Sequence, residues 1–271
     1  MQRKVSHPVS GRSHKLSGVI ITKNEADRIG QCLRPLVGWA DEIIVVDNGS
    51  VDRTVELARR YTPHVIQTHW RGYGKQKQFA LEQASHDWVL SLDADEVVSP
   101  ELRTEIDGVL AGEPSAVAFR IPRQLVAFGG VLRHGDCGHA PIRLFRRDRA
   151  RFSMDEVHES VKVDGRVRKL RSRLTHHGYR GMEHALARAR KYSRLWAAQQ
   201  YDRGRRVNLA HCLVHGAWSF VGVLIFRGGW LDGRRGFIMA ALQSQYTFNK
   251  YATLWSKSLT GLPRPAEPQA R

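Results

Sequence analysis

The run Trp88-Val89-Leu90-Ser91-Leu92-Asp93-Ala94-Asp95-Glu96 decides the fold and points to the chemistry. An apolar stretch of strand length stops at Asp93 and Asp95, two carboxylates spaced two residues apart. A short apolar run predicts a strand that is buried on both faces, and open α/β sheets bind their ligands at the carboxyl ends of such strands. Carboxylates at that edge suit a hard divalent cation completed by phosphate oxygens, so the run predicts a diphosphate-bearing substrate. The alternative is a solvated turn whose acidic residues cap the next helix.

Strands alternate with helices upstream of this run. Apolar runs predict strands at 16–22, 43–46 and 65–68, and helical spacing of apolar residues predicts a helix after each of them. This alternation predicts an α/β fold with a largely parallel sheet and helices on both faces. Polar clusters follow four strand ends, namely Asn24/Glu25, Asp47/Asp52, 70–75 and Asp93/Asp95. Four clusters at one sheet edge predict a single binding crevice.

The charge balance predicts an anionic partner. The 271 residues include 43 Lys and Arg against 26 Asp and Glu, a formal net charge of +17. Nucleic acid, an anionic membrane or a phosphorylated glycan would suit this charge. We find no helix-turn-helix, paired zinc ligands or RNA-binding strand signature, which argues against nucleic acid. A dinucleotide-binding dehydrogenase is also disfavoured. Such an enzyme would carry Gly-x-Gly-x-x-Gly after the first strand, and this chain has Lys23-Asn24-Glu25 there.

The cysteines and the N-terminal residues predict a location in the cytoplasm. The three cysteines are widely separated and odd in number, so neither a disulfide framework nor a zinc site is expected. A reducing, cytoplasmic location follows. Residues 1–15 are polar and basic without an apolar core, which predicts a disordered arm and no secretory signal. Residues 261–271 contain three prolines and are expected to form a disordered tail.

The chain changes character after residue 115. Strands are predicted at 116–121 and at 142–147, where arginines alternate with apolar residues. Acidic residues and a histidine gather just beyond, in Met154-Asp155-Glu156-Val157-His158-Glu159. This segment is either a charged surface turn or an acceptor-side catalytic loop with a carboxylate as general base.

Residues 181–260 are expected to be helical and to associate with a membrane. From residue 183 an aromatic edge is surrounded by arginines and lysines, as in a basic amphipathic helix. Residues 212–226 form the most apolar stretch, but it is shorter than the roughly 20 residues of a spanning helix, and His215 interrupts it. The segment is expected to lie in a membrane interface, with an ordinary pair of core helices as the alternative.

Several motifs together resemble one family. The segments are 19–25, 39–47, 49–54, 72–76, 87–90, 93–96, Arg143-Leu144-Phe145-Arg146-Arg147, Val157-His158-Glu159 and Leu231-Asp232-Gly233-Arg234-Arg235-Gly236. With them the chain resembles the family 2 glycosyltransferases of the GT-A fold, a Rossmann-like nucleotide-sugar-binding sheet. The later motifs are similar to those of the lipopolysaccharide core β-1,4-glucosyltransferases.

The resemblance implies an inverting hexosyltransferase with a divalent cation, Mg²⁺ or Mn²⁺. It would move a hexose, glucose in the group it resembles, from a UDP-sugar to a lipopolysaccharide core or similar lipid-anchored glycan. A capsular or peptide acceptor is the alternative, and the oligomeric state stays open. The GT-A domain would span 16–180, with a donor half at 16–115 and an acceptor half at 116–180. The enzyme would be cytoplasmic and peripheral to the inner membrane, on an anionic surface.

The resemblance also implies residue roles. Nucleotide-sugar contacts fall on Thr22, Asn24, Glu25, Asp47, Gly49, Ser50, Asp52, Lys75 and Asp93. Asp95, with Asp93, would ligate the metal. Glu159 would be the catalytic base with Asp155 as the alternative, and Arg143, Arg146 and His158 would lie on the acceptor side. Members of the family often carry Pro-Asp before the Arg-Leu-Phe element. Gly138-His139-Ala140-Pro141 stands there in this chain, which makes Asp136 a third option for the base.

Overall fold

The computed structural model describes residues 11–135, 139–153 and 160–260. The chain divides into two compact units. Met1–Gln124 and His139–His177 form the first, here called the sheet unit, and Leu125–Gly138 with Gly178–Arg271 form the second, the helical unit. A division near residue 180 was expected, but the segment 125–138 groups with the helices, which the sequence did not indicate.

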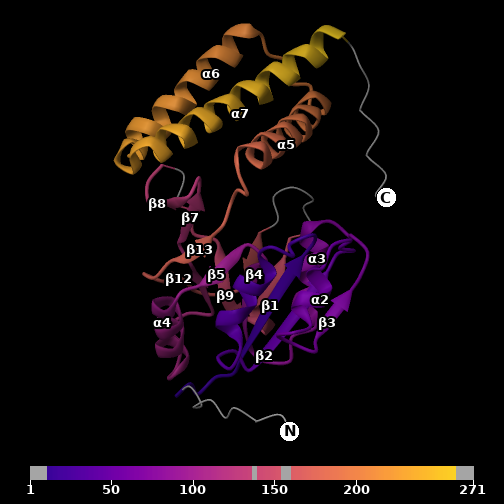
Figure 1. Ribbon diagram of the computed structural model, residues 1–271, viewed down its shortest axis with the longest axis vertical. Helices are drawn as coiled ribbons and strands as arrows, with labels where there is room; N and C mark the ends of the chain where they lie inside the picture. Colours follow the sequence, from indigo (N-terminus) through magenta and orange to yellow (C-terminus); the bar gives the residue numbers. More distant parts are fainter. Residues whose placement is uncertain (1–10, 136–138, 154–159, 261–271) are drawn as a thin grey trace. The chain divides into compact units, whose positions relative to one another are not determined.

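A seven-stranded sheet organises the sheet unit (Figure 1). Its order is β12 (Val167–Lys169), β6 (Ala118–Arg120), β9 (Ile142–Arg146), β4 (Trp88–Asp93), β1 (Leu16–Thr22), β2 (Glu42–Asp47) and β3 (Val65–Gln67). The pairs β4–β1, β1–β2 and β2–β3 are parallel, and so is β12–β6. Strand β9 runs antiparallel to both of its neighbours. The predicted α/β fold with a parallel-rich sheet is therefore confirmed, and the antiparallel strand in its middle was not expected.

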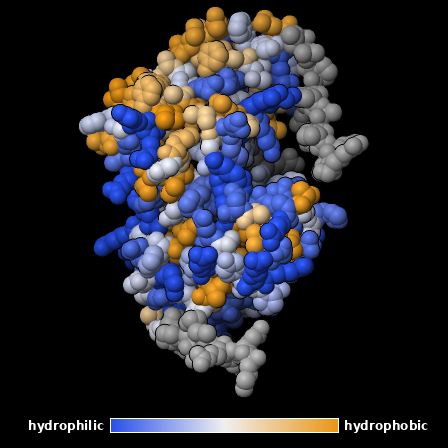
Figure 2. Space-filling view, in the orientation of Figure 1, coloured by the Kyte–Doolittle hydropathy of each residue, from blue (hydrophilic) through white to orange (hydrophobic). Residues whose placement is uncertain are grey.

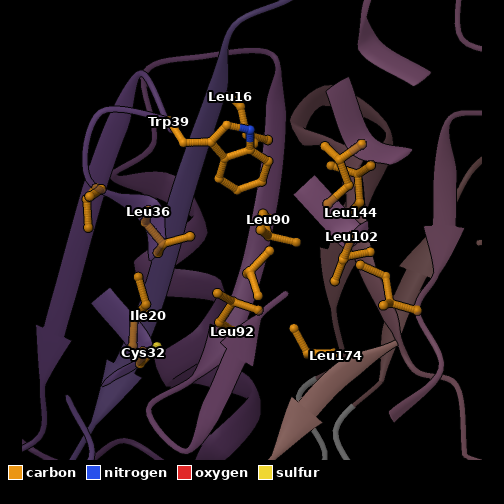
Figure 3. Packing of buried hydrophobic residues seen from close by; sticks show 14 of the residues in the cluster. Leu16, Ile20, Cys32, Leu36, Trp39, Leu90, Leu92, Leu102, Leu144 and Leu174 are labelled. Carbon is orange, nitrogen blue, oxygen red and sulfur yellow. The ribbon is translucent and has the colours of Figure 1, made fainter. Parts of the chain in front are cut away.

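Alternate strand residues form two cores, one on each face of the sheet. Leu16 and Ile20 of β1 pack on one face with Cys32 and Trp39, and Figure 3 shows this cluster with Leu90 and Leu92 of β4. The other face holds a second cluster from β1, β2 and α3: Val19, Ile21, Ile44, Val46, Ala80 and Leu81. Burial on both faces explains why the strands read as continuous apolar runs.

Four short helices connect these strands. They are α1 (Ile29–Leu33), continued by the 3₁₀ turn η1 (Arg34–Leu36), α2 (Thr54–Ala58), α3 (Tyr73–Glu82) and α4 (Pro100–Leu110). Helix α4 was not predicted, although its start is well marked. The Ser99 side chain accepts a hydrogen bond from the Leu102 amide at 3.2 Å, and Pro100 occupies the first turn, where a missing N–H costs nothing.

Smaller strand pairs complete the β structure. Strand β5 (Glu96–Val98) pairs antiparallel with β13 (Leu174–His176). Strand β10 (Ala150–Phe152), which follows the 3₁₀ turn η2 (Arg147–Arg149), pairs with β11 (Val161–Val163). Strands β7 (Arg123–Ala127) and β8 (Gly130–Leu132) form a hairpin. Phe128 and Gly129 at its turn both have positive φ, as a two-residue hairpin turn requires.

The helical unit consists mainly of three helices. Helix α5 (Met182–Asp202) is followed by α6 (Leu209–Val221), a π-helical turn η3 (Gly222–Phe226), a 3₁₀ turn η4 (Gly229–Asp232) and α7 (Gly233–Thr260). Helix α7 packs against both α5 and α6 and lies between them in Figure 1. The predicted C-terminal helical region is confirmed.

The apolar stretch of the helical unit is longer than the sequence indicated. Helix α6 begins at Leu209 because Asn208 and His211 form a capping box, and the helix continues through η3. Among the described residues, Leu209–Phe226 is the one helical segment that is long and apolar enough to cross a membrane by length and composition alone. A buried core helix passes the same test, so the surroundings of α6 have to decide its role.

Candidate active site

The loops after β1 and β2 interlock at the carboxyl edge of the sheet. The Asn24 amide donates to Ser50 Oγ at 2.8 Å, and the Val51 amide donates to Asn24 Oδ1 at 2.9 Å. Asn24 has φ 53, a left-handed conformation that asparagine tolerates better than most residues. The two polar clusters that were predicted to share one crevice are therefore joined by direct hydrogen bonds.

Asp52 and Thr54 extend this connection to the start of α2. Asp52 accepts hydrogen bonds from the Ala26 amide at 3.2 Å and from the Thr54 amide at 3.0 Å. The Glu25 amide donates to Thr54 Oγ1 at 2.8 Å. Burial would raise the pKa of Asp52, but its hydrogen bonds to Thr54 and Ala26 lower it overall. Asp52 is thus held ionised where it fixes the entry to the helix.

Asp47 shapes its own loop. Its carboxylate is fully buried and accepts hydrogen bonds from the Gly49 amide at 3.1 Å, the Ser50 amide at 2.9 Å and the Ser50 hydroxyl. Gly49 has φ +77, which favours glycine at this turn. These contacts hold the loop that the resemblance assigns to the nucleotide.

Asp93 lies within a group of five charged residues, here called the Asp93 cluster, of which Lys77, Glu96 and Arg143 are buried and Asp93 and Arg123 are partly exposed. Lys77 Nζ lies 2.9 Å from one carboxylate oxygen of Asp93, and Arg143 Nη2 lies 2.5 Å from the other. The same Arg143 nitrogen is 2.7 Å from Glu96, which Arg123 also contacts at 3.4 Å. Burial would raise the pKa of Asp93, but the charges of Arg143 and Lys77 hold that pKa well below its usual range. The cluster keeps Asp93 ionised.

The cluster differs from the sequence analysis in two residues. Lys77 contacts Asp93, whereas Lys75 is exposed on the first turn of α3. Arg143 was placed on the acceptor side, but its guanidinium is buried against Asp93 and Glu96. Arg146 is exposed and pairs with Asp148 at 2.9 Å. Lys77 lies on the buried face of α3 with Gly74, Ala80 and Leu81. A lysine on the apolar face of a helix was the signal in the sequence for a buried ion pair.

Asp95 has a histidine partner that the sequence analysis missed. His176 Nε2 lies 3.3 Å from Asp95 Oδ2, and Arg28 Nη1 lies 3.8 Å from the same oxygen. The β5–β13 pairing sets Glu96 opposite His176, and the His177 amide donates to the Asp95 carbonyl at 2.8 Å. Both side chains of the pair remain partly exposed, at 18% and 17%. The Asp93 side chain is 31% exposed, so both carboxylates of Asp93-Ala94-Asp95 reach the surface at this edge of the sheet.

The pair fits a divalent cation only in part. Within residues 11–135, 139–153 and 160–260, no group of three or more potential metal ligands gathers. Asp95 and His176 would supply two ligands, a carboxylate and an imidazole. Mg²⁺ and Mn²⁺ sites in phosphate-handling proteins commonly complete their coordination with water and substrate oxygens. The donor set suits a cation that arrives with a diphosphate.

Buried polar atoms without partners gather at the same edge. Within the described part of the chain, Thr22 Oγ1, Asn48 Oδ1 and both amide atoms of Gln76 have no hydrogen-bond partner. Thr22 ends β1, Asn48 follows β2, and Gln76 lies in α3 next to Lys77. Native folds leave few such groups, and they concentrate where water, an ion or a functional role accounts for them.

The three candidates for the catalytic base and the acceptor-side His158 lie outside the described residues. Glu159, Asp155, His158 and Asp136 belong to the segments 154–159 and 136–138, so the geometry of the acceptor side rests on the sequence.

Comparisons with known proteins identify the family. Residues 17–152 match the model of glycosyl transferase family 2. The chain is 32% identical over 250 residues to the lipopolysaccharide core biosynthesis glycosyltransferase LpsC of Rhizobium meliloti, covering 89% of this chain and 92% of that protein. An uncharacterized glycosyltransferase of Rickettsia typhi is 31% identical, with 90% and 88% covered.

A solved structure supports the fold assignment. The mannosyltransferase of Pyrobaculum calidifontis, solved in complex with GDP-Man and Mn²⁺, matches with a TM-score of 0.54 at 15% identity, covering 94% of this chain and 91% of that one. At this identity the likeness concerns the fold, which is GT-A with a C-terminal helical region. The matched family model, the two relatives and the sheet-edge geometry agree, and the chain belongs to glycosyl transferase family 2.

Proposed function

We propose that this glycosyltransferase moves a hexose, in the first instance glucose, from a UDP-sugar to a lipopolysaccharide core or similar lipid-anchored glycan, with inversion. The observation that carries this proposal is the partly exposed Asp95–His176 pair beside the Asp93 cluster at the edge of a GT-A sheet. LpsC, which aligns over most of the chain, is named for lipopolysaccharide core biosynthesis. That relative guides the choice of acceptor.

The donor half binds and orients the diphosphate. Asp95 and His176 would hold Mg²⁺ or Mn²⁺, whose positive charge stabilises the departing diphosphate. The interlocked loops of Asn24, Asp47 and Asp52 would receive the nucleoside, because they form the polar rim at the ends of β1 and β2. Lys77 and Arg143 act through Asp93: they fix the end of β4 and so position Asp95 two residues on.

The reaction is a single displacement. The acceptor hydroxyl oxygen forms a bond to the anomeric carbon as the bond from that carbon to the phosphate oxygen breaks. The UDP leaves with the bonding electron pair, and the acceptor proton passes to a carboxylate. We assign that base to Glu159, with Asp155 or Asp136 as the alternatives. Attack opposite the leaving group inverts the anomeric centre.

Asp95→Asn tests the donor site. We expect the rate of transfer to fall by at least about 10²-fold, because the developing charge loses its metal-bound stabilisation. Transfer would be measured with purified protein and a panel of UDP- and GDP-sugars, with Mn²⁺, with Mg²⁺ and with EDTA. Asp164→Asn, whose side chain is 89% exposed, is the matched control. Full activity in EDTA or in Asp95→Asn would disprove the metal role, and preference for a GDP-sugar would overturn the UDP assignment.

Glu159→Gln tests the base. We expect turnover to fall by about 10²–10⁴-fold with UDP affinity nearly unchanged, since a general base contributes to the step and little to donor binding. Glu113→Gln, on an exposed position of the sheet unit, serves as the control. Retained turnover in Glu159→Gln, together with its loss in Asp155→Asn or Asp136→Asn, would move the base to the other residue.

A lipid-anchored acceptor also suggests where the enzyme works. We place it at the cytoplasmic leaflet of the inner membrane as a peripheral protein, and the net charge of +17 suits that anionic surface. A panel of lipid-linked and water-soluble core acceptors would test the acceptor class. Equal transfer to capsular glycans or peptides would contradict the assignment to the lipopolysaccharide core.

A further inference from the structure

Helix α6 turns its large apolar side chains outward and its small side chains toward the rest of the helical unit. The exposed stripe of α6 and η3, here called the α6 stripe, consists of Ala210, Leu213, Val214, Ala217, Trp218 and Ile225, and His211 in the first turn is the one exposed polar residue of Leu209–Phe226. Trp218 is 64% exposed and Val214 is equally so. The space-filling view shows apolar residues gathered over this helix (Figure 2). A surface helix of a protein surrounded by water turns its polar face outward, so this stripe is out of place in water.

The small and polar residues of α6 face α7 instead. Ser244 Oγ of α7 donates to the Gly216 carbonyl at 2.8 Å, and Thr247 Oγ1 of α7 donates to Ser219 Oγ at 3.1 Å. The His215 ring stacks on the ring of Tyr251 with centroids 4.3 Å apart. A Cβ at Gly216 would lie 3.3 Å from Phe248 Cβ, so the two helices approach closely there. The exposed stripe is therefore the remaining face of a helix already packed within its unit.

The charge around this stripe has one sign. Residues 203–260 contain eight basic residues, Arg203, Arg205, Arg206, Arg227, Arg234, Arg235, Lys250 and Lys257, and a single acidic one, Asp232. The Asp232 side chain is only 6% exposed and accepts hydrogen bonds from the amides of Arg133 and His134. Arg206 and Arg227 are exposed and flank the apolar helix at its two ends. An apolar face bordered by cations is complementary to anionic lipid.

We propose that the α6 stripe lies in the plane of an anionic phospholipid leaflet, immersed to the level of the acyl chains, with Arg206 and Arg227 at the headgroups. Trp218, Phe226 and Trp230, each exposed by 61% or more, lie at the border, where aromatic side chains favour the membrane interface. Attachment through α6 requires neither the donor nor the acceptor assigned above.

Two competing arrangements fit the structure less well. A spanning α6 would carry α7 with it, because the helices are joined along their length, and α7 contains Arg234, Arg235 and Lys250. A second copy of the chain on the stripe would bring the flanking arginines of both copies together, which costs energy unless anions intervene. Lipid meets both the apolar and the cationic requirement.

Flotation with lipid vesicles tests the surface itself. Full-length protein, without sugar donor or acceptor, is mixed with vesicles of phosphatidylethanolamine and phosphatidylglycerol or with neutral phosphatidylcholine vesicles. We expect binding to the anionic vesicles, and a decrease of at least about tenfold in the partition coefficient of Val214→Ser/Trp218→Ser. Val37→Ser, an exposed valine of the sheet unit, is the matched control and should bind as the wild type does. Wild-type binding by the double variant, or no binding at low salt, would overturn the proposal.

Two further measurements separate the arrangements. In Arg206→Cys and Arg227→Cys, a membrane-impermeant maleimide added outside the vesicles should label both positions above the wild-type background. Protection of one position from the reagent would indicate a spanning helix and refute in-plane attachment. Sedimentation without lipid should show that the double variant has the same association state as the wild type. A dimer that the double variant dissociates would assign the stripe to a second copy instead. Transfer to a water-soluble acceptor is measured separately and needs no membrane. Its result therefore tests the proposed function and leaves the proposed membrane attachment untouched.

Discussion

The two units place their unusual residues in opposite environments. The sheet unit buries charge: Lys77, Glu96 and Arg143 are buried around Asp93, with Glu96 fully enclosed. The helical unit exposes apolar surface: Trp218 is 64% and Phe226 is 70% exposed. Buried ions cost desolvation energy and exposed apolar groups cost hydration energy, so neither arrangement is what stability alone would select. The proposals above account for each of them by a ligand, a charged donor for the sheet unit and a lipid surface for the helical unit.

Arg143→Met is expected to produce the largest effect on stability and probes the buried-charge side of this comparison. Removing the Arg143 guanidinium leaves the fully buried Glu96 with less compensation, which costs about 3–5 kcal/mol in the free energy of unfolding. Urea denaturation followed by circular dichroism measures it. Arg146→Met, on the same strand but exposed and paired with Asp148, should cost no more than about 1 kcal/mol. Equal losses in the two variants would show that the buried cluster has no special energetic role.

His176→Ala is expected to produce the second-largest effect, and it tests whether the imidazole beside Asp95 binds a metal ion. Loss of the imidazole should weaken Mn²⁺ binding in the presence of UDP by about 10–100-fold, a range typical when groups that support a metal site are removed. Titration of Mn²⁺ monitored by electron paramagnetic resonance gives the affinity. His64→Ala, an exposed histidine before β3, is the control. An unchanged Mn²⁺ affinity in His176→Ala would remove this residue from the metal site.

Leu213→Gln should have the smallest effect on stability. It tests whether the apolar surface of the helical unit is exposed. Because Leu213 is 55% exposed on α6, its replacement should change the free energy of unfolding by no more than about 0.5 kcal/mol in lipid-free buffer. Val223→Gln, on the buried side of the same helical segment, should cost several times more. If Leu213→Gln were as destabilising as Val223→Gln, the stripe would be part of a packed core rather than an exposed surface.

The sheet could be predicted because its signals are local. Apolar runs end in polar residues at β1, β2 and β4, and those boundaries agree with the structure to within one or two residues. Helix α4 was missed although Ser99 and Pro100 mark its start and Leu102, Ile106 and Leu110 recur every four residues. The position of β9 could not be predicted, because no local pattern says which strands it joins.

The site was less predictable because its contacts join distant parts of the chain. Asp95 meets His176, 81 positions later, only because β5 pairs with β13. The choice between Lys75 and Lys77 depends on the rotation of α3 about its axis, which a helix of ten residues with few apolar positions hardly specifies. The resemblance put Arg143 on the acceptor side, and no local pattern indicates that its guanidinium turns to the buried Glu96 and to Asp93 across the sheet.

The central position of β9 bears on how the chain acquires its structure. Strands β4 and β6 are both complete in sequence by residue 120, but the strand that joins them spans Ile142–Arg146. Until that segment leaves the ribosome, β4 and β6 present unpaired edges that can recruit other chains. A fragment ending near residue 115 would keep the edge of β4 open permanently. We therefore expect that residues 16–115 do not form a portable module and that the solubility of such a fragment depends on residues beyond it.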